Sequence, residues 1–255
     1  MCGRFVSAST PDELAQYFGA EFADDSLEAS YNVAPTTKVY AIRDADGHRK
    51  LDTMRWGLVP SWAKDIKIGS KLINARAETL FDKPAFRAAA RRRRCLIPAD
   101  GFFEWARVTG QKRKQPYYIQ RGDGDPLAFA GIWETWTVPS PQADGGPDPD
   151  GEHAVITSCT IVTCPPNETM ARVHNRMPVL LAPSDWDRWI APVNDPVRLA
   201  ELLVPAPNGL LVVHPVSTAV NRVGNNFPQL IEPDVNPPEA DNTQSELFDT
   251  GNGAS

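Results

Sequence analysis

The start of the chain carries the residue with the most distinctive chemistry. Cys2 directly follows the initiator methionine, which is usually removed when the next side chain is small. Removal leaves Cys2 with an α-amine and a thiol on adjacent carbons. Such groups titrate at about pH 8 to 8.5 when unperturbed, so part of each is nucleophilic near neutral pH. A 1,2-aminothiol condenses with an aldehyde to an imine, and the thiol then closes a five-membered thiazolidine ring.

This hypothesis needs support from other residues, because most cysteines behave as small buried hydrophobes. Glu104 lies between Phe103 and Trp105 in a predicted strand, and alternation places it on the face opposite these aromatic neighbours. A carboxyl near apolar surface has a raised pKa, which suits general acid–base chemistry. The alternative for Glu104 is an ordinary surface position on a strand.

His174 and Asn74 are two further polar candidates. His174 precedes Pro178 and an apolar stretch at 179–181, so we expect it near the mouth of a strand, although a lone histidine is more often structural. Asn74 is expected to cap a helix within 71–79. Pro84 is expected to divide that region into two short helices.

The composition describes a soluble globular chain. Hydrophobic residues make up 42% and charged residues 23% of the 255 positions, which is typical of such proteins and fits one large domain or two small ones. No apolar run of about 18 residues predicts a membrane helix, and no signal peptide is visible at the start. We therefore expect a cytoplasmic protein.

The cysteines and histidines predict no metal or other cofactor. The four cysteines, at 2, 95, 159 and 164, form no CxxC pair, and the four histidines form no HExxH motif or other ligand cluster. Reduced thiols in a cytosol fit this pattern best.

Charge is distributed unevenly along the chain. Residues 64–121 hold 15 Lys and Arg against 5 Asp and Glu, whereas residues 136–255 hold 5 against 15. The basic segment favours one face that binds a polyanion. The alternative is a solvated, charged helix. Trp62 stands before this segment, and an exposed tryptophan stacks on nucleobases.

The remaining pattern predicts an α+β fold with an antiparallel, barrel-like β core and several short flanking helices. We expect a helix from Thr10 to Gly19 with a capping box, and further helices after Ser184 and over 195–203. Three hairpins are expected: 38–43 with 50–56, 95–99 with 102–105, and 115–120 with 126–133. Two further strands are expected at 154–163 and 210–216. Residues 139–152 read as a flexible loop, and 232–255 as a disordered acidic tail.

Six motifs occur in one order and resemble those of the SRAP family, the abasic-site processing proteins linked to the SOS response. They are Met-Cys-Gly-Arg-Phe, Tyr-Asn-Val-Ala-Pro, Trp-Gly-Leu-Val-Pro-Ser-Trp, Ile-Asn-Ala-Arg-Ala-Glu-Thr, Ala-Asp-Gly-Phe-Phe-Glu-Trp and His-Asn-Arg-Met-Pro. The resemblance covers residues 2–220, which it implies form a single catalytic and DNA-binding domain.

The resemblance also identifies the aldehyde. An abasic site is a deoxyribose without its base, and its ring-opened form carries an aldehyde at C1′. In this family the N-terminal cysteine joins that carbon as a thiazolidine and shields abasic sites in single-stranded DNA. Family members are also described as removing the residue ahead of the cysteine autocatalytically. The expected protein is a nucleoid-associated monomer with peptidase and lyase-like Schiff-base chemistry.

Site residues follow motif by motif. Cys2 matches the family nucleophile, Asn74 the residue that holds the cysteine amine and the sugar, Glu104 the acid–base residue, and His174 the histidine near the imine. Further residues beside these motifs are expected to contact DNA. The arginines Arg4, Arg76 and Arg176 are expected at the phosphates, and Pro35 and Trp62 against bases that flank the lesion. The run Arg91–Arg94 and residues 221–255 match no motif and receive no assignment.

Two other functions remain open on the sequence. Class II glutamine amidotransferases also begin Met-Cys-Gly and use the α-amine as a base, so an N-terminal-nucleophile amidohydrolase is one alternative. A non-covalent single-stranded DNA-binding module is the other, and it predicts salt-reversible binding that survives Cys2→Ala.

Overall fold

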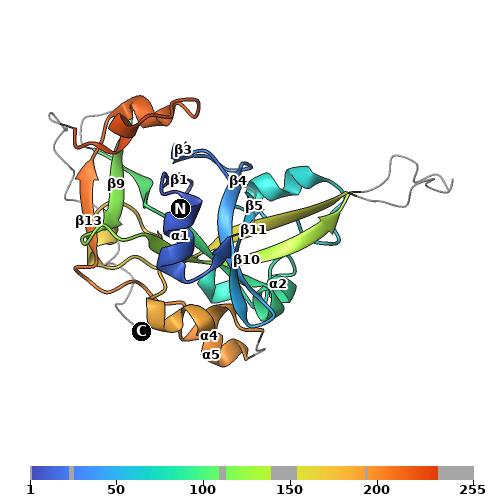
Figure 1. The fold of residues 1–255 in the computed structure, drawn as a ribbon. Helices are drawn as coiled ribbons and strands as arrows, with labels where there is room; N and C mark the ends of the chain where they lie inside the picture. The colour runs from blue at the N-terminus through green and yellow to red at the C-terminus, as the bar shows by residue number, and fades with distance from the viewer. Residues whose placement is uncertain (1, 23–25, 109–112, 139–153, 193–194, 235–255) are drawn as a thin grey trace, which may run out of the picture.

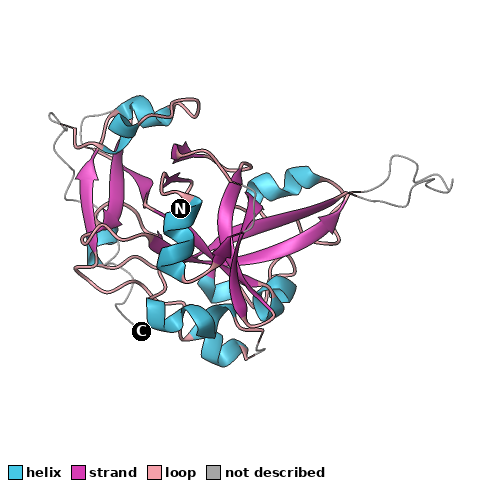
Figure 2. Cartoon of the chain, viewed as in Figure 1, coloured by secondary structure: helices cyan, strands magenta, loops and turns pink. Residues whose placement is uncertain are grey.

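Two β-sheets and a set of short helices form the fold (Figures 1 and 2). The computed structural model describes residues 2–22, 26–108, 113–138, 154–192 and 195–234. The smaller sheet is antiparallel with the strand order β13-β9-β8-β1-β3. Its strands are β1 (Arg4–Ser7), β3 (Ser30–Val33), β8 (Gly101–Ala106), β9 (Gln115–Arg121) and β13 (Leu211–Pro215).

The larger sheet closes on itself as a barrel. Its path is β12-β11-β10-β7-β4-β5-β2, and β6 pairs with β11. A parallel pairing of β5 with β11, at Arg55 opposite Ser158 and Trp56 opposite Cys159, joins the two sides. The strands are β2 (Glu21–Phe22), β4 (Lys38–Ala45), β5 (His48–Trp56), β6 (Asn74–Arg76), β7 (Arg94–Ala99), β10 (Leu127–Thr137), β11 (Val155–Cys164) and β12 (Met177–Pro178). The predicted α+β fold with a barrel-like core is confirmed.

Helix α1 (Pro11–Phe18) forms as its sequence predicts. Thr10 Oγ1 accepts from the Glu13 amide at 3.3 Å, and the Glu13 carboxylate accepts from the Thr10 amide at 2.8 Å, which completes the capping box. Gly19 ends the helix in the left-handed region at φ 58°. The other helices are η1 (Ile66–Lys71), η2 (Ala77–Thr79), α2 (Arg87–Arg92), α3 (Glu168–Ala171), η3 (Pro183–Asp185), α4 (Trp186–Ile190), α5 (Pro196–Ala200), η4 (Thr218–Asn221) and η5 (Pro228–Ile231).

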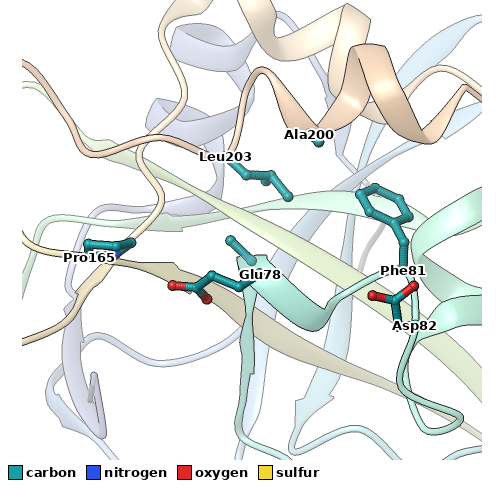
Figure 3. A pocket seen from close by; sticks show the side chains of 7 residues that line it. Glu78, Phe81, Asp82, Pro165, Ala200 and Leu203 are labelled. Atoms are coloured by element: carbon teal, nitrogen blue, oxygen red, sulfur yellow. The ribbon is translucent and has the colours of Figure 1, made fainter. Parts of the chain in front are cut away.

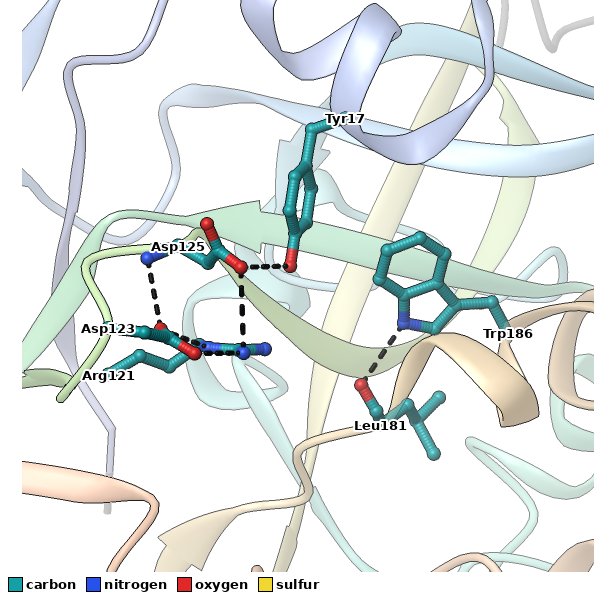
Figure 4. A network of polar contacts seen from close by, with 6 residues as sticks. All are labelled: Tyr17, Arg121, Asp123, Asp125, Leu181 and Trp186. Atoms are coloured by element: carbon teal, nitrogen blue, oxygen red, sulfur yellow. Dashed lines mark hydrogen bonds and ion pairs between the residues drawn. The ribbon is translucent and has the colours of Figure 1, made fainter.

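Contacts of Tyr17 tie α1 to the rest of the molecule (Figure 4). The Tyr17 hydroxyl donates to Asp125, in the turn after β9, at 3.4 Å. An Asp125 carboxylate oxygen lies 3.6 Å from a guanidinium nitrogen of Arg121, the last residue of β9. The Tyr17 ring also packs against Trp186 of α4, with ring centroids 5.7 Å apart. Helix α1 is therefore fixed to β9 and α4.

Two of the three predicted hairpins are wrong. The β4–β5 hairpin forms, but β7 and β8 belong to different sheets, and so do β9 and β10. Strand β7 instead pairs with β10, and β8 pairs with β9. Between β7 and β8, the Asp100 carboxylate accepts from the backbone amides of Ala8 and Ser9, just after β1, so this residue contacts the smaller sheet at the point where the chain leaves the larger one.

Two predicted helix caps are also wrong. Asn74 begins strand β6, where it lies opposite Ile161 of β11, so strand pairing determines its backbone rather than helix capping. Ser184 lies inside η3, because Pro183 already occupies the first turn there, and α4 begins after Asp185. The predicted loop at 139–152 lies outside the described residues. Of the predicted disordered tail at 232–255, residues 235–255 also lie outside them, but the start of the tail is wrong, because Pro233 bridges to Val216 and the Asp234 amide donates to the Pro215 carbonyl at 2.9 Å. No helix among the described residues is long and apolar enough to cross a membrane.

Among the described residues, Arg94 is the most deeply buried positively charged side chain. Its side chain is 1% exposed and donates to the carbonyls of Ala90 at the end of α2 and of Trp189 and Ala191 at the end of α4. Burial lowers the pKa of Arg94 to about 10, so it stays charged at neutral pH. A cation is favourable beside the carbonyls of a helix C-terminus, and here it joins two helices to β7.

Replacing Arg94 with leucine is expected to lower the free energy of unfolding by about 3 kcal/mol or more. The substitution removes charge-assisted hydrogen bonds, each contributing roughly 1.5–3 kcal/mol, and leaves buried carbonyls without a donor. Urea titration followed by circular dichroism measures the change. The matched control is Arg91→Leu, because Arg91 is exposed on α2 and should shift stability by only about 0.5 kcal/mol. Equal effects of the two variants would contradict the role of Arg94.

Candidate active site

Cys2 lies where the two sheets meet. It lies two residues before the start of β1 of the smaller sheet and is fully buried. The Asn74 Nδ2 group donates to the Cys2 carbonyl oxygen at 2.8 Å. Asn74 belongs to β6, which the barrel strand β11 holds in place. The hydrogen bond therefore fixes the N-terminal strand against the barrel.

The other polar atom of Asn74 is an unused acceptor. Asn74 Oδ1 is buried and has no hydrogen-bond partner among the described residues. A buried acceptor left unpaired costs stability, so such atoms are uncommon outside functional sites. The Asn74 side chain thus holds Cys2 with its amide nitrogen and retains a free acceptor beside it.

Glu104 faces the interior of the site, as the sequence predicts. It is 2% exposed, and its neighbour Phe103 packs in a small separate cluster with Tyr118 and Trp105. Phe102, on the same face of β8 as Glu104, belongs to the main core. Burial raises the pKa of the Glu104 carboxyl, as expected for a group that apolar residues surround.

His174 follows α3 and lies across from Glu104. Its Nδ1 accepts from the Arg176 amide at 3.0 Å, which leaves the proton of the neutral ring on Nε2. Nε2 lies 4.0 Å from a Glu104 oxygen. Burial lowers the pKa of His174 to about 4, so the imidazole is neutral at physiological pH.

The Cys2 thiol is protonated in this environment. Burial raises its pKa far above the ordinary range, and Glu104, when it is ionised, raises it further. A neutral thiol is a weak nucleophile. The site therefore brings together Cys2, Asn74, Glu104 and His174, with a carboxyl placed to influence both the thiol and the imidazole.

Lys114 is a charged neighbour of the site that the sequence analysis missed. It stands just before β9, whose first residue Gln115 lies opposite Ala106 of β8. Its positive charge lowers the pKa of His174 in the same direction as burial, which is the larger cause. At Glu104 the same charge opposes the larger effect of burial, which raises the pKa. The correct β8–β9 pairing would have placed it near Glu104, but the expected hairpin paired β9 with another strand.

Two arginines predicted to contact phosphates are engaged within the protein. Arg4 donates to Asn32 Oδ1 at 2.7 Å, and Asn32 in turn donates to three carbonyls between residues 220 and 225. Arg176 forms a forked ion pair with Glu78 and donates to the Thr163 carbonyl.

The other predicted DNA contacts lie on separate segments. Arg76 is exposed at the end of β6, Pro35 is half-buried in the turn after β3, and the Trp62 side chain is 59% exposed. A DNA contact by any of these residues, or by Arg4 and Arg176, stays a prediction.

A pocket of about 290 Å³ lies between η2 and α5 (Figure 3). Figure 3 shows the Phe81 ring and the Leu203 side chain across from each other, with the carboxylates of Glu78 and Asp82 below them. The pocket is lined by η2, α5 and Pro165 rather than by Cys2. Its link to the site is indirect, through Glu78, which binds Arg176, whose amide donates to His174.

A known family matches most of the chain. The sequence profile described as SOS response associated peptidase (SRAP) matches residues 1–223. This chain belongs to the SRAP family. Within the family, the abasic site processing protein YoqW of Bacillus subtilis is 41% identical over 235 residues, which cover 91% of this chain and 99% of that protein.

More distant SRAP relatives carry similar names. The abasic site processing protein YedK of Escherichia coli is 31% identical over 240 residues, covering 91% of this chain and 100% of its own. The abasic site processing protein HMCES of Xenopus tropicalis is 30% identical over 276 residues, covering 90% and 77%. A crystal structure of a Bacteroides thetaiotaomicron protein has the same fold, with a TM-score of 0.79 over 92% of this chain and 100% of its own at 23% identity.

Proposed function

We propose that this protein processes abasic sites in single-stranded DNA. After Met1 is removed, Cys2 joins the ring-opened aldehyde of the lesion as a thiazolidine. The observation that carries the proposal is the convergence of Cys2, Asn74, Glu104 and His174 at the junction of the two sheets. The names of the relatives support the substrate.

The condensation proceeds in three balanced steps. First, the sugar opens when a proton reaches its ring oxygen and the C1′ hydroxyl loses its proton, which gives the aldehyde. Second, the Cys2 amine adds to C1′, and the carbinolamine loses one water to form an imine. Third, the thiol sulfur adds to C1′ while its proton moves to the nitrogen. The product contains protein and DNA minus one water.

The residues around Cys2 have the properties that these steps need. Glu104, with its raised pKa, is the proton donor to the ring oxygen. Asn74 Oδ1, a buried acceptor without a partner among the described residues, receives a hydrogen bond from the new α-amine. The neutral His174 donates through Nε2 to the opened sugar. Glu104, deprotonated after the first step, then takes the thiol proton as the sulfur attacks and passes it to the nitrogen.

The same site serves for the removal of Met1. Hydrolysis of the Met1–Cys2 peptide bond consumes one water and frees the amine that the condensation requires. Asn74 Nδ2 already holds the Cys2 carbonyl, which keeps the backbone next to the scissile bond in place. This peptidase step, a monomeric state and a location on the nucleoid are parts of the proposal that separate experiments must test.

The proposal is tested by changing only the aldehyde. An oligonucleotide with a natural abasic site is compared with one that carries a tetrahydrofuran analogue, which has the same shape but no aldehyde. We expect a denaturation-resistant adduct with the first strand and none with the second. An adduct with both strands, or with neither, would contradict the proposal.

The His174 pKa leads to a pH prediction. Because His174 stays neutral above about pH 5, its titration should not shape the rate of adduct formation between pH 5.5 and 8. His174→Gln should therefore slow the reaction by about 10-fold or more while leaving the shape of the pH–rate profile unchanged. Single-turnover rates at saturating DNA measure both quantities. Loss of a step near pH 6.5 in the variant would show that His174 titrates in the wild-type protein.

A further inference from the structure

The segment 61–71 next to the site has no part in the chemistry above. It carries Trp62 and three lysines. We name these lysines, Lys64, Lys67 and Lys71, the lysine track. The Trp62 side chain is 59% exposed, and all three lysines are exposed. Lys67 is 88% exposed and has only a long ion pair with Asp65 at 3.9 Å, while Lys64 and Lys71 form no ion pair within the described residues. The track therefore presents three solvated cations beside an exposed indole.

The backbone of this segment is held firmly. Gly57 and Gly69 approach so closely that a Cβ on either would lie 2.6 Å from the other's carbonyl oxygen. Beneath the track, Trp136 packs with Val59 and Ala63 in a small core of its own, and the Trp136 Nε1 group donates to the Ala63 carbonyl at 2.7 Å. The fold thus supports an exposed, basic segment with dedicated packing.

The track leads directly to the site. Helix η1, cyan in Figure 1, ends at Lys71, and only two residues separate it from Asn74. The second of them, Ile73, is fixed because its carbonyl accepts from the Trp56 Nε1 group at 2.9 Å. A strand whose lesion lies at Cys2 would therefore pass the track on one side of the lesion.

We propose that the lysine track binds the phosphodiester backbone of single-stranded DNA on one side of the abasic site, next to the base contact that the family resemblance implies for Trp62. This rests on the proposed function, since it assumes that the lesion lies at Cys2. When the lysine ammonium groups bind the phosphates, they release counterions from the strand, so binding weakens as the salt concentration rises. The exposed indole face adds sequence-independent stacking.

A second basic surface supplies a matched control. Arg87 and Arg91 lie one turn apart on α2, Lys83 lies in the turn four residues before Arg87, and all three are exposed. Figure 1 shows α2 at the opposite end of the barrel from η1. The basic residues of 64–121 therefore do not form the single face expected from the sequence. Replacing either set of three by glutamate changes the net charge equally but alters a different surface.

The test compares the Lys64→Glu, Lys67→Glu, Lys71→Glu variant with the control variant Lys83→Glu, Arg87→Glu, Arg91→Glu. Affinity for an undamaged single strand is measured by fluorescence anisotropy over a range of salt. We expect the track variant to bind at least about 10-fold more weakly, and its slope of log affinity against log salt to fall by about 2, which is roughly 0.7 for each lost cation. The control should shift affinity by less than about 2-fold. Equal losses in both variants, or none in the track variant, would overturn the proposal.

Two further readouts complete the design. Strands extended only 5′ or only 3′ of the lesion locate the track, because the variant should lose affinity for one of them and not for the other. Equal losses for both would contradict binding on one side. Adduct yield at saturating abasic DNA should remain as in the wild-type protein, so failure of the adduct in both proteins would reject the proposed function while the affinity data still judge the track.

Discussion

Cys2→Ala is expected to abolish the stable adduct with an abasic strand, which is the largest effect that we predict. Alanine retains the α-amine after Met1 removal, so an imine with C1′ still forms, but no sulfur is present to close the ring. An imine hydrolyses when the protein is denatured, whereas a thiazolidine survives. Denaturing gel electrophoresis should show no shifted band, and weaker, salt-sensitive binding should remain under native conditions.

The control for this variant is Cys159→Ala. Cys159 is also fully buried, in β11 of the barrel, so it matches the loss of one buried sulfur without touching the N-terminus. It should form the adduct as the wild-type protein does. Borohydride reduction offers a second check, because it should trap the imine of Cys2→Ala as a covalent amine. Undiminished adduct formation by Cys2→Ala without reduction would reject the thiazolidine mechanism.

Glu104→Gln is expected to slow adduct formation by at least about 100-fold, the usual lower range for loss of a general acid or base. Glutamine preserves the shape of the side chain and its hydrogen bonding but cannot transfer a proton to the sugar or accept one from the thiol. The measurement is a single-turnover time course at saturating DNA. Affinity should change little, because the substitution acts on the rate of the chemical steps.

The control for Glu104 is Glu134→Gln, a second nearly buried glutamate, at 6% exposed, that pairs with Arg93. We expect it to lower stability and to leave the rate per folded molecule unchanged. Thermal melts of both variants separate unfolding from loss of chemistry. An unchanged rate in folded Glu104→Gln would remove this carboxyl from the acid–base role.

Local patterns predicted the parts of the site that local geometry determines. The face of Glu104 followed from alternation along one strand, and the cap of α1 followed from Thr10 and Glu13 within one helical turn. These features depend on neighbours a few residues away. The partners of a strand depend on segments far apart in the chain, which the pattern does not encode. The strand position of Asn74 and the proximity of Lys114 to Glu104 were missed for that reason.

The arginine run shows the same limit at single residues. Four identical side chains from Arg91 to Arg94 take three different environments: two are exposed, Arg93 pairs with Glu134, and Arg94 is buried between two helix ends. Helical spacing predicts that they point in different directions. Only the tertiary packing of α2 and α4 shows which one is enclosed.

Intact mass spectrometry tests the central claim most directly. Purified protein is incubated with a single-stranded oligonucleotide that carries one abasic site, and the mixture is quenched under denaturing conditions. The account predicts a species with the mass of the protein without Met1 plus the oligonucleotide minus one water, and digestion should place the added mass on Cys2. Protein that lacks Met1 but gains no mass would contradict it, because the aminothiol would then be exposed without reacting with the abasic aldehyde.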